Sequence, residues 1–148
     1  MITFSRLGKK GNLGNQLFQI ASTIGIAKFN GHPYAFPYWR YSQFFKNKLP
    51  LLDSQIQFKN LNEKGFEYFE YRLGDNNYDL NGWFQSEKYF DIGLVKEQFN
   101  FKKGLTVRLK LKYGHLLDSK HILISVRRGD FVNHPYYFKL TYKYYFWP

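Results

Sequence analysis

The stretch Ile122-Leu-Ile-Ser-Val-Arg-Arg-Gly-Asp130 is the part of the sequence from which the fold is most directly predicted. Four of its first five residues are large and aliphatic, without regular polar alternation, which predicts a parallel strand over 122–126 that is buried on both faces. The sequence Arg-Arg-Gly-Asp (127–130) follows at the carboxyl end of that strand. Open α/β sheets bind their ligands beyond the carboxyl ends of the strands, so a binding site is expected here.

Arg127 and Arg128 have the chemistry of an anion site. Each guanidinium is a planar fork of donors that suits a phosphate or pyrophosphate. Gly129 is a turn residue, and Asp130 could hold one arginine in its rotamer or bond a sugar or base. The alternative is an ordinary surface cluster of ion pairs after a core strand.

Composition limits the class of protein. The chain has 148 residues, of which 44% are hydrophobic and 22% aromatic, enough for one packed domain or slightly more. It contains no cysteine, which excludes disulfides and thiolate metal sites and fits a reducing compartment. No apolar run could cross a bilayer and residues 1–10 lack the apolar region of a signal peptide, so a cytoplasmic protein without an integral membrane segment is expected.

The net charge of +11 predicts an anionic partner. Nucleic acid, a nucleotide-sugar and an anionic membrane surface all satisfy it, and basic residues interleave with aromatic ones throughout. No recognisable RNA- or DNA-binding motif is present, so the charge favours a polyphosphate ligand without choosing among these. The four histidines include no pair at metal-ligand spacing, and no metal site is expected.

The amino-terminal part predicts a strand, a glycine-rich loop and a helix. Residues 2–7 fit a short strand, and residues 8–16 form the loop. Apolar residues then recur at helical spacing as far as Ala27, and Asn30-Gly31 is a helix stop. This order brings backbone N–H groups and the positive end of a helix towards an anion. A tight turn capped by Asn15 explains the loop equally well.

The remaining sequence predicts further elements with less regular patterns. In chain order these are a short strand and an irregular segment within 32–45, a polar loop over 46–62, strands over 66–71 and 78–84 separated by a turn at 73–77, a helical region over 85–99, and an ambiguous segment over 105–113 that alternates like a strand but could be a helix.

Three blocks together carry a resemblance to a known family. They are Gly11-Asn-Leu-Gly-Asn-Gln-Leu-Phe-Gln19, Asn81-Gly-Trp-Phe-Gln-Ser-Glu-Lys-Tyr-Phe90 and Val126-Arg-Arg-Gly-Asp-Phe-Val132. In this order they resemble the bacterial α-1,2-fucosyltransferases. The resemblance implies an α/β fold of GT-B architecture, with a Rossmann-like amino-terminal domain over 1–118 and the first strand of a donor domain in 119–148. It also implies a glycosyltransferase with GDP-fucose as donor, a galactose-containing oligosaccharide as acceptor, inversion, and no cofactor or metal.

The resemblance assigns roles to individual residues. Arg127, Arg128 and Asp130 match the family motif that contacts the GDP moiety, with Arg127 and Asp130 as catalytic residues. Ser125 stands in the same donor site where the motif begins with histidine, which weakens the match at that position. The glycine loop, with Gly14, Asn15 and Gln16, is expected to face the same cleft and to bind the donor substrate.

Other interpretations remain open at the level of sequence. Chemistry assigns no role to the block 81–90, for which a packed strand-to-helix junction is favoured. Most of a donor domain would follow Pro148, so the 148 residues alone are not expected to turn over GDP-fucose. The alternatives to a fucosyltransferase are a shortened, non-catalytic relative that binds a glycan or nucleotide and, less favoured, a basic nucleic-acid binder.

Overall fold

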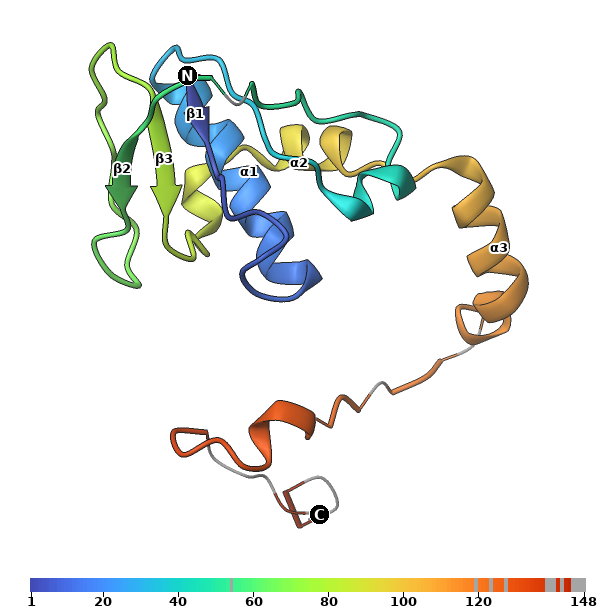
Figure 1. The fold of residues 1–148 in the computed structure, drawn as a ribbon. Coiled ribbons are helices and arrows are strands. Elements are labelled where there is room, and N and C mark those ends of the chain that lie inside the picture. Colours follow the sequence, from blue (N-terminus) through green and yellow to red (C-terminus); the bar gives the residue numbers. More distant parts are fainter. Residues whose placement is uncertain are drawn as a thin grey trace. The chain divides into compact units, whose positions relative to one another are not determined.

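The chain divides into two compact units, Met1–Thr106 and Val107–Pro148, in a computed structural model (Figure 1). The model describes residues 1–53, 55–118, 120–122, 124–126, 128–137, 141 and 143–144.

A small parallel sheet organises the first unit. Its strands are β1 (Ile2–Thr3), β2 (Lys59–Asn62) and β3 (Tyr78–Asn81), in the spatial order β1-β3-β2, and both pairings are parallel. Tyr78 is opposite Ile2 on one side and Lys59 on the other. The expected mixture of helices with a parallel sheet is therefore present. The strands predicted over 2–7 and 78–84 are shorter than expected, and the loop predicted over 46–62 is wrong at its end, where β2 forms.

Helix α1 (Leu13–Phe29) packs on this sheet as its apolar spacing predicted. Ile20, Ile24 and Ala27 recur on one face and are all buried, and the helix contacts β1. The stop is confirmed, because Asn30 is the carboxyl-terminal cap and its Nδ2 donates to Ile26 O at 2.9 Å. The other end differs from the sequence interpretation.

The amino-terminal cap of α1 is Asn12 rather than Asn15. Asn15 lies one turn into the helix, where its Oδ1 accepts the backbone N–H of Asn12 at 3.2 Å. The side chain of Asn15 thus stabilises the entry into the helix in the manner of a capping box. Sequence spacing alone did not separate these two positions, because both are asparagines that precede the apolar face.

Close packing joins α1 to the helical region that follows β3. This region contains the 3-10 turn η2 (Glu87–Tyr89) and α2 (Ile92–Gln98), so the predicted helical region is confirmed in two pieces. A Cβ on Gly25 would overlap the carbonyl of Tyr89. Glycine is therefore required there for the two backbones to approach.

The core is unusually aromatic. Phe4, Phe36 and Phe84 are fully buried, and Phe4 meets Phe84 edge to face with ring centroids 6.5 Å apart. Each such side chain contributes about 1.5–3 kcal/mol through burial. Aromatic side chains thus supply much of the packing of the first unit, while others, such as Tyr38 and Phe66, remain exposed.

Two expected strands of the first unit are replaced by irregular chain. The segment 33–36 makes only single parallel bridges, Tyr34 to Ile2 and Phe36 to Leu51, before the 3-10 helix η1 (Arg40–Phe44). The strand expected over 66–71 is wrong. Side chains rather than a neighbouring strand bind that backbone: Asn30 Nδ2 donates to the carbonyl of Tyr71 at 2.9 Å.

The ambiguous segment 105–113 is helical, within α3 (Lys103–Tyr113), and the division between the units falls inside this helix. None of its residues is buried. The second unit continues with the 3-10 turns η3 (Gly114–Leu116) and η4 (Gly129–Phe131).

The strand expected over 122–126 is also wrong. The described residues of that stretch, 122 and 124–126, are not in a strand. Ile122, Ile124 and Val126 are 93%, 50% and 52% exposed. A strand buried on both faces needs neighbouring strands and helices, and the described part of the second unit contains no strand that could pair with it. The expected first strand of a donor domain is therefore not formed.

Candidate functional site

The candidate site in the first unit lies where β1 and β3 end. Because the strands are parallel, the loops that follow them leave the same edge of the sheet. Asp79 ties the two together: its Oδ1 accepts the backbone N–H of Ser5 at 2.8 Å and its Oδ2 accepts the hydroxyl of Ser5 at 2.6 Å. This pair fixes the start of the glycine loop against β3.

The glycine loop owes its shape to positive φ angles and to the buried Gln16. Gly8 and Gly11 have φ of +83° and +73°, which other residues rarely adopt. Gln16 Nε2 donates to the carbonyl of Gly11 at 2.8 Å, while Gln16 Oε1 accepts the indole N–H of Trp39 at 2.8 Å. Both ends of the amide are thus engaged within the protein. Gln16 is placed to position the loop.

Gly14 and Asn15 lie at the surface of the same helix end. Gly14 is exposed, and no heavy atom lies within 4 Å of where its Cβ would be. Leu13 and Gly14 are the first two residues of α1, whose N–H groups have no acceptor inside the helix. The first turn contains no acidic residue. A ligand oxygen could therefore approach this helix end without meeting a carboxylate.

The side chain of Trp83 brings the sequence block 81–90 into contact with the block 11–19. A Cβ on Gly11 would lie 3.0 Å from Cζ3 of Trp83 and 2.6 Å from Cβ of Asn15, so the indole closes over the glycine. Lys10 Nζ lies 4.5 Å from the centre of the Trp83 ring, a cation–π distance. The blocks 11–19 and 81–90, separated by more than sixty residues of sequence, therefore meet at one place.

The backbone beneath Trp83 is held by a carboxylate. Glu63, directly after β2, accepts the N–H of Trp83 at 2.6 Å and the N–H of Phe84 at 2.8 Å. Phe84 has φ of +49°, and its carbonyl accepts the hydroxyl of Ser22 at 2.7 Å. A non-glycine residue in this region costs about 1–3 kcal/mol and persists where its surroundings hold it, often at binding sites.

Sequence reasoning missed Glu63. It lies one residue beyond a strand that the sequence interpretation treated as loop, and its partners are about twenty residues away. The register of β2 against β3, with Asn62 opposite Asn81, is what brings it there. No local pattern in the sequence signals that contact.

The arginine motif belongs to the second unit. Arg127 lies outside the described residues. Ser125 and Arg128 are exposed, Gly129 has φ of +45° as expected for a turn residue, and the backbone of Asp130 is part of η4.

A small aromatic stack follows the motif. The ring centroids of Phe131 and Tyr137 are 4.0 Å apart, and those of His134 and Tyr137 are 4.2 Å apart. The glycine-loop residues and the arginine motif thus reside in separate units, each with its own local packing.

Two tyrosines of the first unit have perturbed acidity. Burial raises the pKa of Tyr71 and the pKa of Tyr89 above the ordinary value. The hydroxyl of Tyr71 accepts the N–H of Lys64 at 3.1 Å, and that of Tyr89 accepts the N–H of Phe69 at 3.2 Å, which oppose the rise. Both are neutral acceptors that bind the chain between β2 and β3, so their role is structural.

Among the described residues, no group of three or more His, Asp or Glu side chains is arranged to hold a metal ion. Among the same residues, no helix has the length and apolar character that crossing a membrane requires.

Comparison with known proteins gives no match to a protein-family model, to a curated protein or to a solved structure.

Proposed function

We propose that this chain belongs to an α-1,2-fucosyltransferase, an enzyme that transfers fucose from GDP-fucose to a galactose-type hydroxyl of an oligosaccharide. The observation that supports it most is the meeting of Trp83 with Gly11 at the carboxyl edge of a parallel sheet. Two of the three sequence blocks that carry the resemblance, 11–19 and 81–90, therefore lie together. They lie at the edge of the sheet where open α/β sheets bind ligands. A GT-B architecture of two Rossmann-like domains is part of the proposal.

In the proposed chemistry, the arginine motif stabilises the negative charge that develops on the leaving group, GDP. The acceptor hydroxyl attacks the anomeric carbon of fucose from the face opposite GDP, the bond to the β-phosphate oxygen breaks, and the hydroxyl proton passes to a base. Negative charge builds on the departing oxygen, where Arg127 and Arg128 would stabilise it more in the transition state than in the ground state. No metal ion is needed for that neutralisation.

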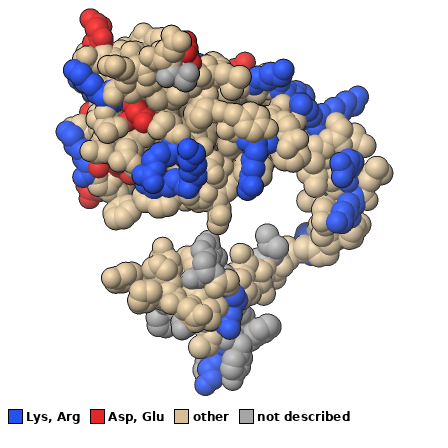
Figure 2. All heavy atoms as spheres, viewed as in Figure 1, with Lys and Arg blue, Asp and Glu red and all other residues tan. Residues whose placement is uncertain are grey.

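The charge distribution fits a diphosphate ligand. Residues 107–148 contain eight Lys or Arg and two Asp or Glu, a net charge of +6. Figure 2 shows basic side chains along the surface of α3, and on the visible face of the first unit as well. Such a field attracts polyphosphates in general, so it supports the ligand class and not the identity of the sugar.

Isothermal titration of GDP and GDP-fucose in the presence of EDTA tests the proposal. Replacing Arg127 or Arg128 by Lys keeps the charge but removes the bidentate fork, and GDP affinity is expected to fall about tenfold, the equivalent of about 1.4 kcal/mol. Arg108→Lys, an exposed position in α3, is the matched control and should leave the affinity unchanged.

Three results would go against parts of this proposal. Equal GDP affinity in both motif variants would remove the arginines from the donor site. A strict requirement for Mg²⁺ or Mn²⁺ would contradict the metal-free mechanism. Equal affinity for GDP-fucose and for an unrelated nucleotide-sugar such as UDP-galactose would favour the alternative of a non-catalytic protein that binds nucleotides.

A further inference from the structure

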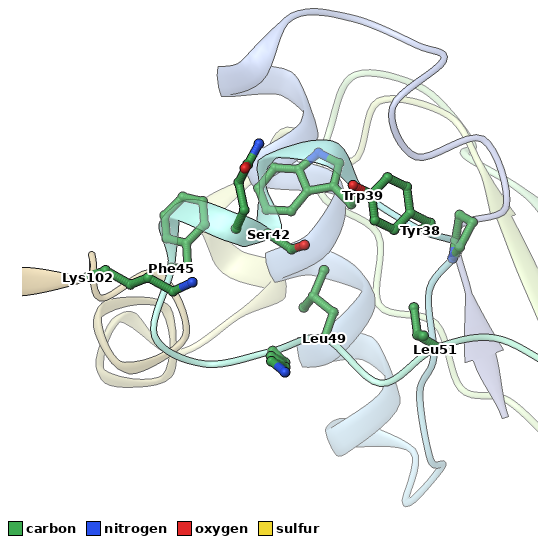
Figure 3. A pocket seen from close by; sticks show the side chains of 10 residues that line it. Tyr38, Trp39, Ser42, Phe45, Leu49, Leu51 and Lys102 are labelled. Carbon is green, nitrogen blue, oxygen red and sulfur yellow. The ribbon is translucent and has the colours of Figure 1, made fainter. Parts of the chain in front are cut away.

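A pocket of about 210 Å³ lies beside η1 in the first unit (Figure 3). None of the residues Gly14, Asn15, Gln16 or Trp83 lines it, so it is separate from the glycine-loop site. The pocket is therefore a feature to which the proposed transfer reaction assigns no residue.

The floor of the pocket is preformed. Trp39, Phe45 and Leu49 line it and are buried members of the core. The rings of Trp39 and Phe45 stack with centroids 5.5 Å apart, and the indole N–H of Trp39 is already engaged by Gln16. Such a floor offers apolar surface whose side chains lose no further freedom when a ligand binds.

The mouth of the pocket is apolar and open. Tyr38 and Leu51 stand at it with 77% and 72% of their surface exposed, and Figure 3 shows them on the side of the pocket opposite Lys102. Large apolar side chains that remain this exposed around a concavity are typical of a binding site.

Among the described residues that line the pocket, the charged ones are Lys48 and Lys102, and none is Asp or Glu. Within the described residues neither lysine makes a salt bridge. Ser42 adds a hydroxyl beside the floor, whereas the amide nitrogen of Gln43 is taken by the carbonyl of Arg40 at 3.0 Å. A ligand that meets these groups would carry negative charge at one end and apolar surface at the other.

Size limits the ligand to about one ring. An apolar cavity of about 150 Å³ holds benzene, so a pocket of about 210 Å³ holds a single ring with a small substituent. We propose that this pocket binds a small organic anion, namely one apolar ring that carries a phosphate or carboxylate. The ring lies on Trp39 and Leu49, and the anionic group faces Lys48 and Lys102.

The test uses four probes on the whole chain: phenyl phosphate, benzoate, benzyl alcohol and inorganic phosphate. Isothermal titration at low ionic strength should give at least tenfold tighter binding of one of the two ring anions than of benzyl alcohol or inorganic phosphate. Which anion binds more tightly distinguishes a phosphate ligand from a carboxylate. Higher salt should weaken the binding, because the lysines lie near solvent.

Substitutions distinguish binding in this pocket from non-specific attraction of an anion to the basic surface. Replacing Lys48 and Lys102 together by Gln should weaken the ring anion about tenfold. Ser42→Leu, which fills the pocket, should abolish binding. The control replaces Lys59 and Lys96, two exposed lysines outside the pocket, by Gln and should have no effect.

The inference is overturned if benzyl alcohol binds as tightly as the ring anions, or if the control variant loses as much affinity as the pocket variant. It is also overturned if no ring probe binds at millimolar concentration. The two lysine variants alter only exposed side chains, so they keep the test decisive even where Ser42→Leu fails to fold. GDP affinity of the Lys48/Lys102 variant should be unchanged, which separates failure here from failure of the proposed function.

Discussion

At the scale of single residues, Glu63 is the group on which the candidate site most depends. One carboxylate accepts two successive N–H groups, those of Trp83 and Phe84, and thereby holds the strained backbone at Phe84. Removal of the Glu63 carboxylate leaves these two backbone N–H donors without an acceptor. Both donors lie in the turn that sets the Trp83 ring against Gly11.

Glu63→Ala is therefore expected to lower the free energy of unfolding by about 1–3 kcal/mol, the cost of leaving two partly buried donors unsatisfied. Urea denaturation measures it. Glu67→Ala, at an exposed position whose side chain makes no salt bridge with the described residues, is the control and should change stability little. If the two variants lost the same stability, the carboxylate would not be holding the turn.

The raised pKa values of Tyr71 and Tyr89 lead to a prediction at alkaline pH. The folded state disfavours the ionised hydroxyls, so the stabilisation that follows is fully present below the ordinary tyrosine pKa of about 10 and is lost as pH rises through the folded-state values. The free energy of unfolding should therefore fall more steeply above pH 10 than it does when both residues are Phe.

Urea unfolding at several pH values between 8 and 11 gives the slope of the free energy of unfolding against pH. Wild type is compared with the Tyr71→Phe, Tyr89→Phe double variant and with a control that carries Phe at the exposed Tyr38 and Tyr136. The control should keep the wild-type slope. A slope equally steep in the buried-site variant would mean that these two hydroxyls do not titrate differently on folding.

At the scale of elements, the packing of α1 on η2 is the most constrained contact. A Cβ at position 25 would overlap the carbonyl of Tyr89, and backbone atoms cannot rotate away as a side chain can. The two elements would have to separate, and Ser22, which donates to Phe84 O, lies on the same helix. Strain there would reach the turn that carries Trp83.

Gly25→Ala is expected to destabilise the protein by about 1–3 kcal/mol, the usual cost of overpacking, despite the better helix propensity of alanine. Gly104→Ala in α3 is the matched control, because no atom lies within 4 Å of its Cβ position. The control should stabilise by up to about 1 kcal/mol. Melting temperatures that fall for Gly25→Ala and rise for Gly104→Ala would support the contact. Equal melting temperatures for the two variants would contradict it.

Local sequence signals predicted some elements well because the physics that forms them is local. Helix α1 combines apolar residues at helical spacing with a stop at Asn30-Gly31, and both features act within a few residues. Strands depend on partners far along the chain. The runs at 66–71 and 122–126 have strand-like composition, yet no strand lies beside either among the described residues. For 105–113 the sequence pattern left strand and helix open, and the segment is a helix.

At the scale of the whole molecule, the sequence predicted the glycine loop and its place at a strand-to-helix junction, but not the groups that complete it. Trp83 meets Gly11, and Glu63 holds the backbone of Trp83, only through the strand order β1-β3-β2, which no short motif encodes. The division into Met1–Thr106 and Val107–Pro148 was likewise not visible in composition, because it falls inside α3 and no linker-like stretch marks it.

The central claim is the proposal that this chain binds GDP-fucose, and it is tested separately at the glycine loop and Trp83 of the first unit and at the arginine motif of the second unit. The most direct measurement is an NMR titration of the ¹⁵N-labelled chain with GDP-fucose in EDTA, with UDP-galactose as the control nucleotide-sugar. The expected result is saturable shifts of the amides of Gly11, Gly14 and Arg128 and of the Trp83 indole N–H, with much weaker effects of UDP-galactose. Unchanged resonances at these four positions, or equal shifts with both nucleotide-sugars, would contradict the claim.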